Sequence, residues 1–159
     1  MIKVLFVCTG NICRSPMAEA VLRHVVAEAG LSDQIEVDSA GTSDEEVGNP
    51  IHRGTLQVLN KHHISHEPRR YARQITRADM HDFDYLLAMD KGHLARLGRF
   101  TEANQATFAL FLQYANQAGT TPVEEVPDPW YTGRFDETYD LVTKGCAAFL
   151  AYLRQRHGL

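Results

Sequence analysis

The stretch of sequence that decides the fold is a loop near the start of the chain, Cys8-Thr9-Gly10-Asn11-Ile12-Cys13-Arg14-Ser15. An apolar run at residues 2–7 precedes it, and a helix-like stretch that opens Ser15-Pro16-Met17 follows it. The five residues between Cys8 and Arg14 let the backbone curl, so that successive N–H groups point inward at the positive end of the helix. A phosphate group fits such a nest of donors. The loop therefore predicts an anion site with a thiol at one end and a guanidinium at the other.

The two reactive side chains of this loop indicate what the anion site does. The positive field favours the thiolate form of Cys8, which is the form that attacks phosphorus. Arg14 provides a planar fork that binds two phosphate oxygens and neutralises charge in the transition state. The alternative is an ordinary strand-to-helix turn, in which Gly10 and Asn11 take left-handed dihedrals and the cysteines are simply buried. The phosphate site is favoured, because a motif is more specific when its surroundings also match. Here a strand precedes Cys8, turn residues separate Cys8 from Arg14, and Ser and Pro at a helix start follow.

Five segments of the chain together resemble the low-molecular-weight protein tyrosine phosphatase family. The sequence VCTGNICRSPMAEA at residues 7–20 closely resembles the family signature. The other four segments keep the family's order and read SAGT at 39–42, ARQIT at 72–76, FDYLLAMD at 83–90 and DPWY at 128–131. The resemblance runs nearly from end to end. It implies a protein-tyrosine phosphatase that hydrolyses phosphotyrosine through a cysteinyl-phosphate intermediate and releases inorganic phosphate, without a metal or an organic cofactor.

The composition fits such an enzyme and argues against other classes of protein. With 159 residues, the chain is expected to form a single domain, residues 1–159, with a sizeable core. A formal charge of −4 and the lack of a basic stripe argue against a nucleic-acid partner. No apolar stretch is long enough to span a bilayer, and the first residues lack a signal-peptide pattern, so no membrane partner is expected. Three cysteines are too few for a disulfide scaffold, which favours reduced thiols and a cytoplasmic location.

Eight histidines raise the question of a metal site. Zinc sites usually show Cys-x2-4-Cys or His-x3-His clusters placed for tetrahedral closure, whereas Cys8 and Cys13 belong to the predicted phosphate loop. We therefore expect neither a metal nor another cofactor.

Apolar strand-like runs alternate with helical patterns, which predicts a parallel sheet with helices on both faces. Strands are expected at residues 2–7, 34–38, 85–89 and 107–112, and helices at 15–29, 51–62, 91–97 and 135–156. Periodicity leaves 107–112 open between helix and strand, but the family has a fourth parallel strand near here. The expected fold is thus a single-domain, Rossmann-like α/β fold, with a four-stranded parallel sheet and the phosphate loop after strand 1. Cys8 and Asp90 both follow strands, at the edge where such sheets bind ligands.

Splitting phosphate from a phenol requires a proton donor for the leaving oxygen, and Asp128 is the candidate. It lies between Pro127 and Pro129, which stiffen the backbone around it. An Asp-Pro pair is more often a plain turn. The resemblance to the family's Asp-Pro acid loop implies that Asp128 protonates the tyrosyl oxygen and later takes a proton from the hydrolytic water.

The remaining candidates bind the substrate or shape the loop. Ser15 is expected to cap the first helix and, as in the family, to donate its hydroxyl to the Cys8 sulfur. Asn11 is expected to hold the loop open. Trp130 and Tyr131 are either core aromatics or a wall that stacks on a substrate ring and excludes phosphoserine. The residues expected to bind substrate are Thr9, Gly10, Asn11, Ile12, Cys13, Ser15, Trp130 and Tyr131.

Two stretches depart from the family pattern. His66 resembles a family histidine that supports the loop asparagine, but residues 67–71 separate it from Ala72 where the family normally has one residue. In the variable loop that lines the family's pocket, an aromatic and a histidine are replaced by Glu45 and Glu46. Exposed acidic residues are usually just solvated, yet this location also fits an effect on substrate choice.

Three alternative functions remain open. Arginine phosphatases share the fold and loop, but they have threonine at the position of Ile12 and an aromatic-poor acid loop. Arsenate reductases linked to thioredoxin require a further cysteine pair in mid-chain, and nothing between Cys13 and Cys146 supplies it. A non-enzymatic phosphate-binding module would not need both Cys8 and Asp128.

Overall fold

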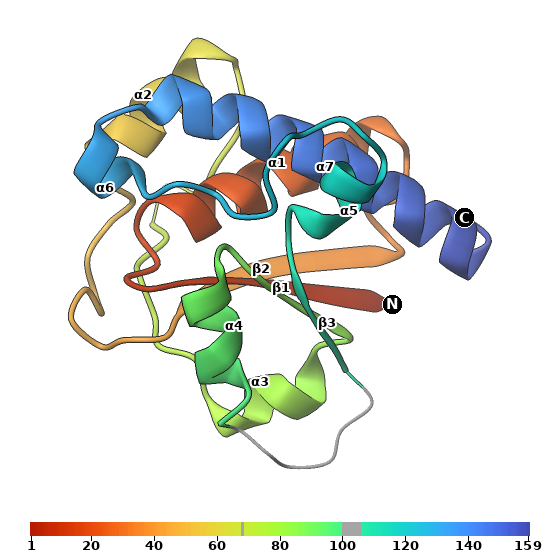
Figure 1. Ribbon diagram of the computed structural model, residues 1–159, viewed down its shortest axis with the longest axis horizontal. Helices are drawn as coiled ribbons and strands as arrows, with labels where there is room; N and C mark the ends of the chain where they lie inside the picture. Colours follow the sequence, from red (N-terminus) through yellow and green to blue (C-terminus); the bar gives the residue numbers. More distant parts are fainter. Residues whose placement is uncertain (68, 100–105) are drawn as a thin grey trace.

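The computed structural model describes residues 1–67, 69–99 and 106–159, and its centre is a four-stranded parallel sheet (Figure 1). The strands are β1 (Ile2–Cys8), β2 (Ile35–Gly41), β3 (Tyr85–Ala88) and β4 (Thr107–Leu110). Their order is β2-β1-β3-β4, and every neighbouring pair is parallel. The predicted α/β fold is confirmed. Because β2 lies on one side of β1 and β3 on the other, the strand order reverses at β1, and the loop after β1 occupies the usual ligand position.

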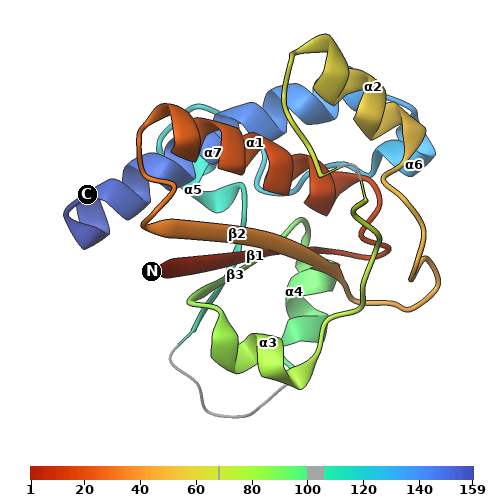
Figure 2. The same ribbon diagram turned by 180° about the vertical axis from the view of Figure 1, so that it is seen from behind.

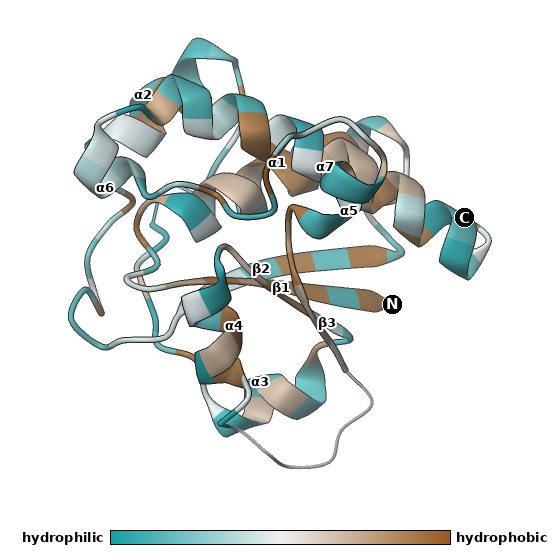
Figure 3. Cartoon of the chain, viewed as in Figure 1, coloured by the Kyte–Doolittle hydropathy of each residue, from teal (hydrophilic) through white to brown (hydrophobic). Residues whose placement is uncertain are grey.

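Helices cover both faces of the sheet (Figures 1 and 2). One face carries α1 (Arg14–Glu28), α2 (Arg53–Lys61), α5 (Gln113–Gln117), α6 (Pro129–Thr132) and α7 (Phe135–His157). The other carries α3 (Arg77–Asp82) and α4 (Lys91–Leu97). Hydrophobic residues gather along the strands and in α1, whereas the last turn of α7 is hydrophilic (Figure 3). No helix of the described residues combines the length and apolar character that crossing a membrane requires.

The alternation of side chains along β1 assigns Cys8 to one side of the sheet. Val4, Phe6 and Cys8 belong to the larger core cluster with α1 and α7, whereas Leu5 and Val7 belong to the cluster with α3 and α4. The thiol therefore lies on the face of the sheet that α1 covers.

The structure differs from the sequence prediction mainly at short elements and boundaries. β2 continues to Gly41, beyond the expected end at residue 38, because its pairing with β1 extends to the pair Cys8 and Gly41. The segment 107–112 is a strand only up to Leu110. The short helices α3, α5 and α6, of six, five and four residues, were not predicted. Helices this short depend on tertiary contacts more than on local propensity.

Candidate active site

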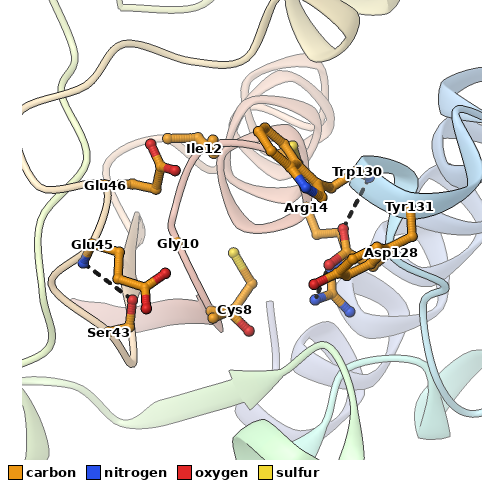
Figure 4. Close-up of a pocket in the computed structure, with 12 residues that line it drawn as sticks. Cys8, Gly10, Ile12, Arg14, Ser43, Glu45, Glu46, Asp128, Trp130 and Tyr131 are labelled. Atoms are coloured by element: carbon orange, nitrogen blue, oxygen red, sulfur yellow. Dashed lines mark hydrogen bonds and ion pairs between the residues drawn. The ribbon is translucent and has the colours of Figure 1, made fainter.

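Cys8 ends β1, and its side chain points into a pocket at the carboxyl edge of the sheet (Figure 4). The residue is only 3% exposed. The Ser15 hydroxyl lies 2.9 Å from Cys8 Sγ, and the backbone N–H of Asn11 donates to the same sulfur at 3.3 Å. Hydrogen-bond donors around a sulfur favour its thiolate form. The loop thus surrounds Cys8 with groups suited to a nucleophile.

Asn11 lies behind the thiol and holds the loop in its curled form. Its φ of 60° is in the left-handed region, which costs a non-glycine residue about 1–2 kcal/mol. The amide nitrogen of its side chain donates to Ser15 Oγ at 2.8 Å and to Ser39 Oγ at 2.9 Å. Its side-chain oxygen accepts the backbone N–H of Arg73 at 3.1 Å. These three bonds offset the backbone strain and connect the loop to β2.

Arg14 is the first residue of α1, and its guanidinium lies under the loop on the β3 side. Its Nη1 donates to Asp90 Oδ2 and to the Val126 carbonyl oxygen, both at 3.0 Å. Its Nη2 lies 3.4 Å from Asp128 Oδ2. Burial opposes ionisation of Asp90, but the hydrogen bond from the His93 N–H and the positive charge of Arg14 lower its pKa. The ionised Asp90 therefore orients Arg14 while leaving part of the fork available to an anion.

His93, on α4, is a site residue that the sequence did not reveal. Its Nε2 lies 2.8 Å from Thr9 Oγ1 and 3.5 Å from Arg14 Nη2. Burial and the charge of Arg14 lower the pKa of His93 to about 4, so the ring is neutral at pH 7. The only local signal is its position three residues after Asp90, whose side chain caps α4 by accepting the His93 N–H.

Asp128 stands beside Arg14 on the rim of the pocket. It is the N-cap of α6, and its Oδ1 accepts the N–H of Trp130 at 3.1 Å, so the expected proline-stiffened loop contains a helical turn. Trp130 and Tyr131 are 56% and 84% exposed, which contradicts the alternative that they are core aromatics. Ser43, Glu45 and Glu46 line the opposite side of the pocket (Figure 4).

The structure brings most of the predicted site residues to this pocket. Those that line it are Cys8, Thr9, Gly10, Ile12, Cys13, Arg14, Asp128, Trp130 and Tyr131. Asn11 and Ser15 do not line it but lie beneath it, fully buried. Burial and the charge of Cys8 raise the pKa of Cys13 to about 12, which keeps the second thiol of the loop protonated. No cluster of three or more metal-ligating side chains exists within residues 1–67, 69–99 and 106–159.

Two supporting residues make contacts other than the helix cap expected of Ser15 and the family role that His66 resembles. Ser15 is not the helix cap, because α1 begins one residue earlier and its N-cap, Cys13, makes no side-chain cap bond; the Ser15 hydroxyl instead contacts Cys8 and Asn11. His66 does not support Asn11, because its Nε2 pairs with Asn60 Oδ1 at 3.2 Å. Arg70 contacts the loop instead, through a hydrogen bond to Asn11. It belongs to the stretch 67–71, of which residue 68 lies outside the described part.

Fold and site together define an α/β protein with a thiol at the base of an anion-binding loop. A family model described as low molecular weight phosphotyrosine protein phosphatase matches residues 3–158. The low molecular weight protein-tyrosine-phosphatase YfkJ of Bacillus subtilis is 41% identical over 160 residues, which cover 100% of both chains. The low molecular weight protein-tyrosine-phosphatase PtpA of Staphylococcus epidermidis is 37% identical, with 96% of this chain and 94% of that one covered. The chain therefore belongs to the low molecular weight phosphotyrosine protein phosphatase family.

Solved structures agree with this assignment. The crystal structure of YfkJ from Bacillus subtilis has a TM-score of 0.91 and covers 98% of this chain and 96% of that chain, at 41% identity. The crystal structure of DARP, an arginine phosphatase of Drosophila, has a TM-score of 0.87 at 33% identity and covers 96% of this chain and 98% of that chain. The same fold thus accompanies two substrate classes among these relatives.

Proposed function

We propose that this protein is a protein-tyrosine phosphatase, which hydrolyses phosphotyrosine in protein substrates. The proposal rests on the convergence of three side chains on one pocket: the Cys8 thiol, the Arg14 guanidinium and the Asp128 carboxyl group. A nucleophile, a phosphate-binding cation and a proton donor are the groups that hydrolysis of an aryl phosphate requires. The family to which the chain belongs is named for this activity.

In the first step, the Cys8 thiolate attacks phosphorus in line with the bond to the tyrosyl oxygen. The S–P bond forms as the P–O bond breaks, and protonated Asp128 delivers its proton to the departing phenolate oxygen. Arg14 and the inward N–H groups of the loop bind the phosphate oxygens. They stabilise the charge of the transition state, and Asp90 keeps the guanidinium in place at 3.0 Å.

In the second step, water hydrolyses the cysteinyl phosphate. Asp128, now a carboxylate, takes a proton from the water as its oxygen attacks phosphorus, and the S–P bond breaks to return the Cys8 thiolate. Inorganic phosphate is the product. No step requires a metal ion. We also propose a cytoplasmic location, since three cysteines are too few for a disulfide scaffold and are expected to remain reduced.

The side walls of the pocket favour phosphotyrosine over phosphoarginine. Trp130 and Tyr131 offer aromatic faces to a substrate ring, and Trp130 is itself braced by the His52 ring at a centroid distance of 5.5 Å. Ile12, where the resemblance implies threonine in arginine phosphatases, lines the same pocket. A turnover assay should therefore show hydrolysis of phosphotyrosine peptides and much slower hydrolysis of phosphoarginine and phosphoserine peptides, with no reduction of arsenate. Preferential hydrolysis of phosphoarginine would instead identify the protein as an arginine phosphatase.

The acidic wall of the pocket predicts a preference among phosphotyrosine peptides. Glu45 and Glu46 lie across from Trp130, so they should disfavour acidic residues that flank the phosphotyrosine and favour basic or neutral ones. Each exposed charge pair contributes only about 0–1 kcal/mol and is screened by salt, so the preference should be modest and confined to low ionic strength. We expect Glu45→Gln/Glu46→Gln to flatten it in kcat/KM without slowing a small aryl phosphate. Identical rankings of peptide pairs by both enzymes would show that the glutamates are merely solvated.

The second thiol of the loop predicts reversible inactivation by peroxide. Cys8 and Cys13 line the same pocket, and oxidation of Cys8 to a sulfenic acid removes one of the charges that raise the pKa of Cys13. Attack of Cys13 on the sulfenic acid would form a disulfide and release water, which protects Cys8 from irreversible oxidation. After peroxide treatment, wild type should regain activity with a dithiol, and Cys13→Ser should regain much less. Equal recovery would argue against a protective role.

A further inference from the structure

Arg70 is a largely buried cation behind the phosphate loop that the mechanism above does not use. Its side chain is 11% exposed, although the neighbouring Arg69 is exposed. Nη1 donates to the backbone carbonyl oxygen of Asn11 at 2.9 Å, and Nη2 donates to Ser39 Oγ at 2.7 Å. Arg14 approaches the loop from the side of β3, whereas Arg70 approaches it from the side of β2, where Ser39 lies.

The contacts of Arg70 are directed at the loop more than at its acidic neighbour. Its Nε lies 3.7 Å from Glu19 Oε1, which is longer than both hydrogen bonds to the loop and to Ser39. Glu19 also has a closer cation, because Arg23 Nη1 lies 2.9 Å from its Oε2. The ion pair with Glu19 therefore accounts for only part of the position of the Arg70 guanidinium.

The bond from Arg70 to Asn11 determines how the loop presents its N–H groups. Asn11 has a φ of 60°, and a residue in this region keeps that conformation only where its surroundings over-determine it. In a trans peptide the C=O and the following N–H point in opposite directions, so a bond that draws the Asn11 carbonyl toward Arg70 turns the Ile12 N–H away from it. On the other side of Asn11, its own N–H donates to Cys8 Sγ at 3.3 Å.

The charge of Arg70 also acts on the nucleophile. Burial lowers the pKa of Arg70, and the negative charges of Glu19, Cys8 and Asp38 oppose that effect. The interaction is reciprocal, so the Arg70 guanidinium adds positive charge to the surroundings of the Cys8 sulfur. Even a lowered arginine pKa leaves the group charged at pH 7.

We propose that Arg70 is a positioning residue of the phosphate loop, one that fixes the Asn11 peptide from behind and supplies a second positive charge near Cys8. The inference rests on the proposed phosphatase function. Arg70 touches neither phosphate nor the leaving group, and it acts through Asn11, Ser39 and the field at Cys8. Its role explains why the chain can depart from the family spacing at 67–71 without leaving Asn11 unsupported.

The test compares Arg70→Ala and Arg70→Lys with Arg69→Ala, a matched control at an exposed arginine. We expect Arg70→Ala to lower kcat/KM for an aryl phosphate by about 10- to 100-fold, the usual cost of a small misplacement in an active site. In Arg70→Ala, inhibition by inorganic phosphate should weaken, and alkylation of Cys8 by iodoacetamide at pH 7 should slow. Both values are corrected for the fraction of folded protein, which thermal denaturation gives. Arg70→Lys should recover part of the alkylation rate, because it restores charge, but less of the phosphate affinity, because it lacks the planar fork. Arg69→Ala should match wild type in all three measurements.

The proposal for Arg70 can be overturned even if one variant does not fold. If Arg70→Ala does not fold, Arg70→Lys is compared with wild type, since it keeps a cation and most of the aliphatic stem. Wild-type phosphate inhibition and wild-type alkylation in whichever variant folds would overturn the proposal and leave Arg70 a stability residue. If wild type itself fails to hydrolyse phosphotyrosine peptides, the proposed function fails. Phosphate binding, followed directly by calorimetry, and Cys8 alkylation still report on Arg70 in that case.

Discussion

Replacement of Cys8 by serine should abolish turnover while phosphate binding survives. In wild type, Cys8 Sγ lies 2.9 Å from Ser15 Oγ and accepts the Asn11 N–H at 3.3 Å. Serine is nearly the same size as cysteine, so its hydroxyl can keep both hydrogen bonds. The nest of N–H groups and the Arg14 guanidinium also remain. What is lost is an easily ionised nucleophile, because a hydroxyl does not form an anion near pH 7 as a thiol does. We expect kcat to fall by at least about four orders of magnitude, as for removal of other catalytic nucleophiles.

The measurement combines turnover of an aryl phosphate with calorimetric titration of inorganic phosphate. Cys146→Ser is the matched control, because Cys146 is a fully buried thiol of α7 that donates a weak hydrogen bond to the Ala18 carbonyl oxygen at 3.8 Å. It should retain the catalytic constants of wild type. Substantial turnover by Cys8→Ser would mean that another group attacks phosphorus, and the proposed mechanism would be wrong.

The sequence was most informative where function and fold depend on neighbouring residues. The apolar strand, the turn residues and the helix start around Cys8 lie within one short stretch, so their pattern predicts both β1 and the anion loop after it. Long elements such as α7, with 23 residues, give a clear helical period. The ambiguity at 107–112 could not be resolved by period, because a short buried strand and a buried helical segment look alike.

The supporting residues were hidden because they act across long sequence separations. Arg70 is 59 positions from Asn11, and His93 is 84 positions from Thr9, so no local pattern connects either pair. Ser15 shows a different limit. Its residue type is typical of a helix cap, but the tight turn of the loop lets α1 begin at Arg14, which frees the hydroxyl to contact Cys8. Tertiary packing therefore decides which of two roles a side chain takes.

Replacement of Asp128 by asparagine should slow substrates with poor leaving groups far more than activated ones. The amide keeps an oxygen that can accept the Trp130 N–H, as Oδ1 does at 3.1 Å, so α6 should keep its cap. It has no proton to give to a phenolate. A phenyl phosphate with a poor leaving group needs that proton in the transition state, whereas a nitrophenyl phosphate leaves as a stabilised anion. General acid catalysis is typically worth about 10²- to 10⁴-fold, and we expect a loss in this range for the poor leaving groups only.

The decisive measurement is the slope of log kcat/KM against the pKa of the leaving phenol, which reports the first step of the reaction. The slope should become steeper in Asp128→Asn, since without the proton donor negative charge accumulates on the departing oxygen. Asp136→Asn is the control, because the Asp136 side chain is 73% exposed and forms a surface ion pair with Lys61 at 3.2 Å. Unlike this control, Asp128→Asn also removes the carboxyl group that lies 3.4 Å from Arg14 Nη2, so phosphate binding should be retained or strengthened. A uniform loss across the series, together with weakened phosphate binding, would show that Asp128 shapes the pocket and that the proton comes from elsewhere.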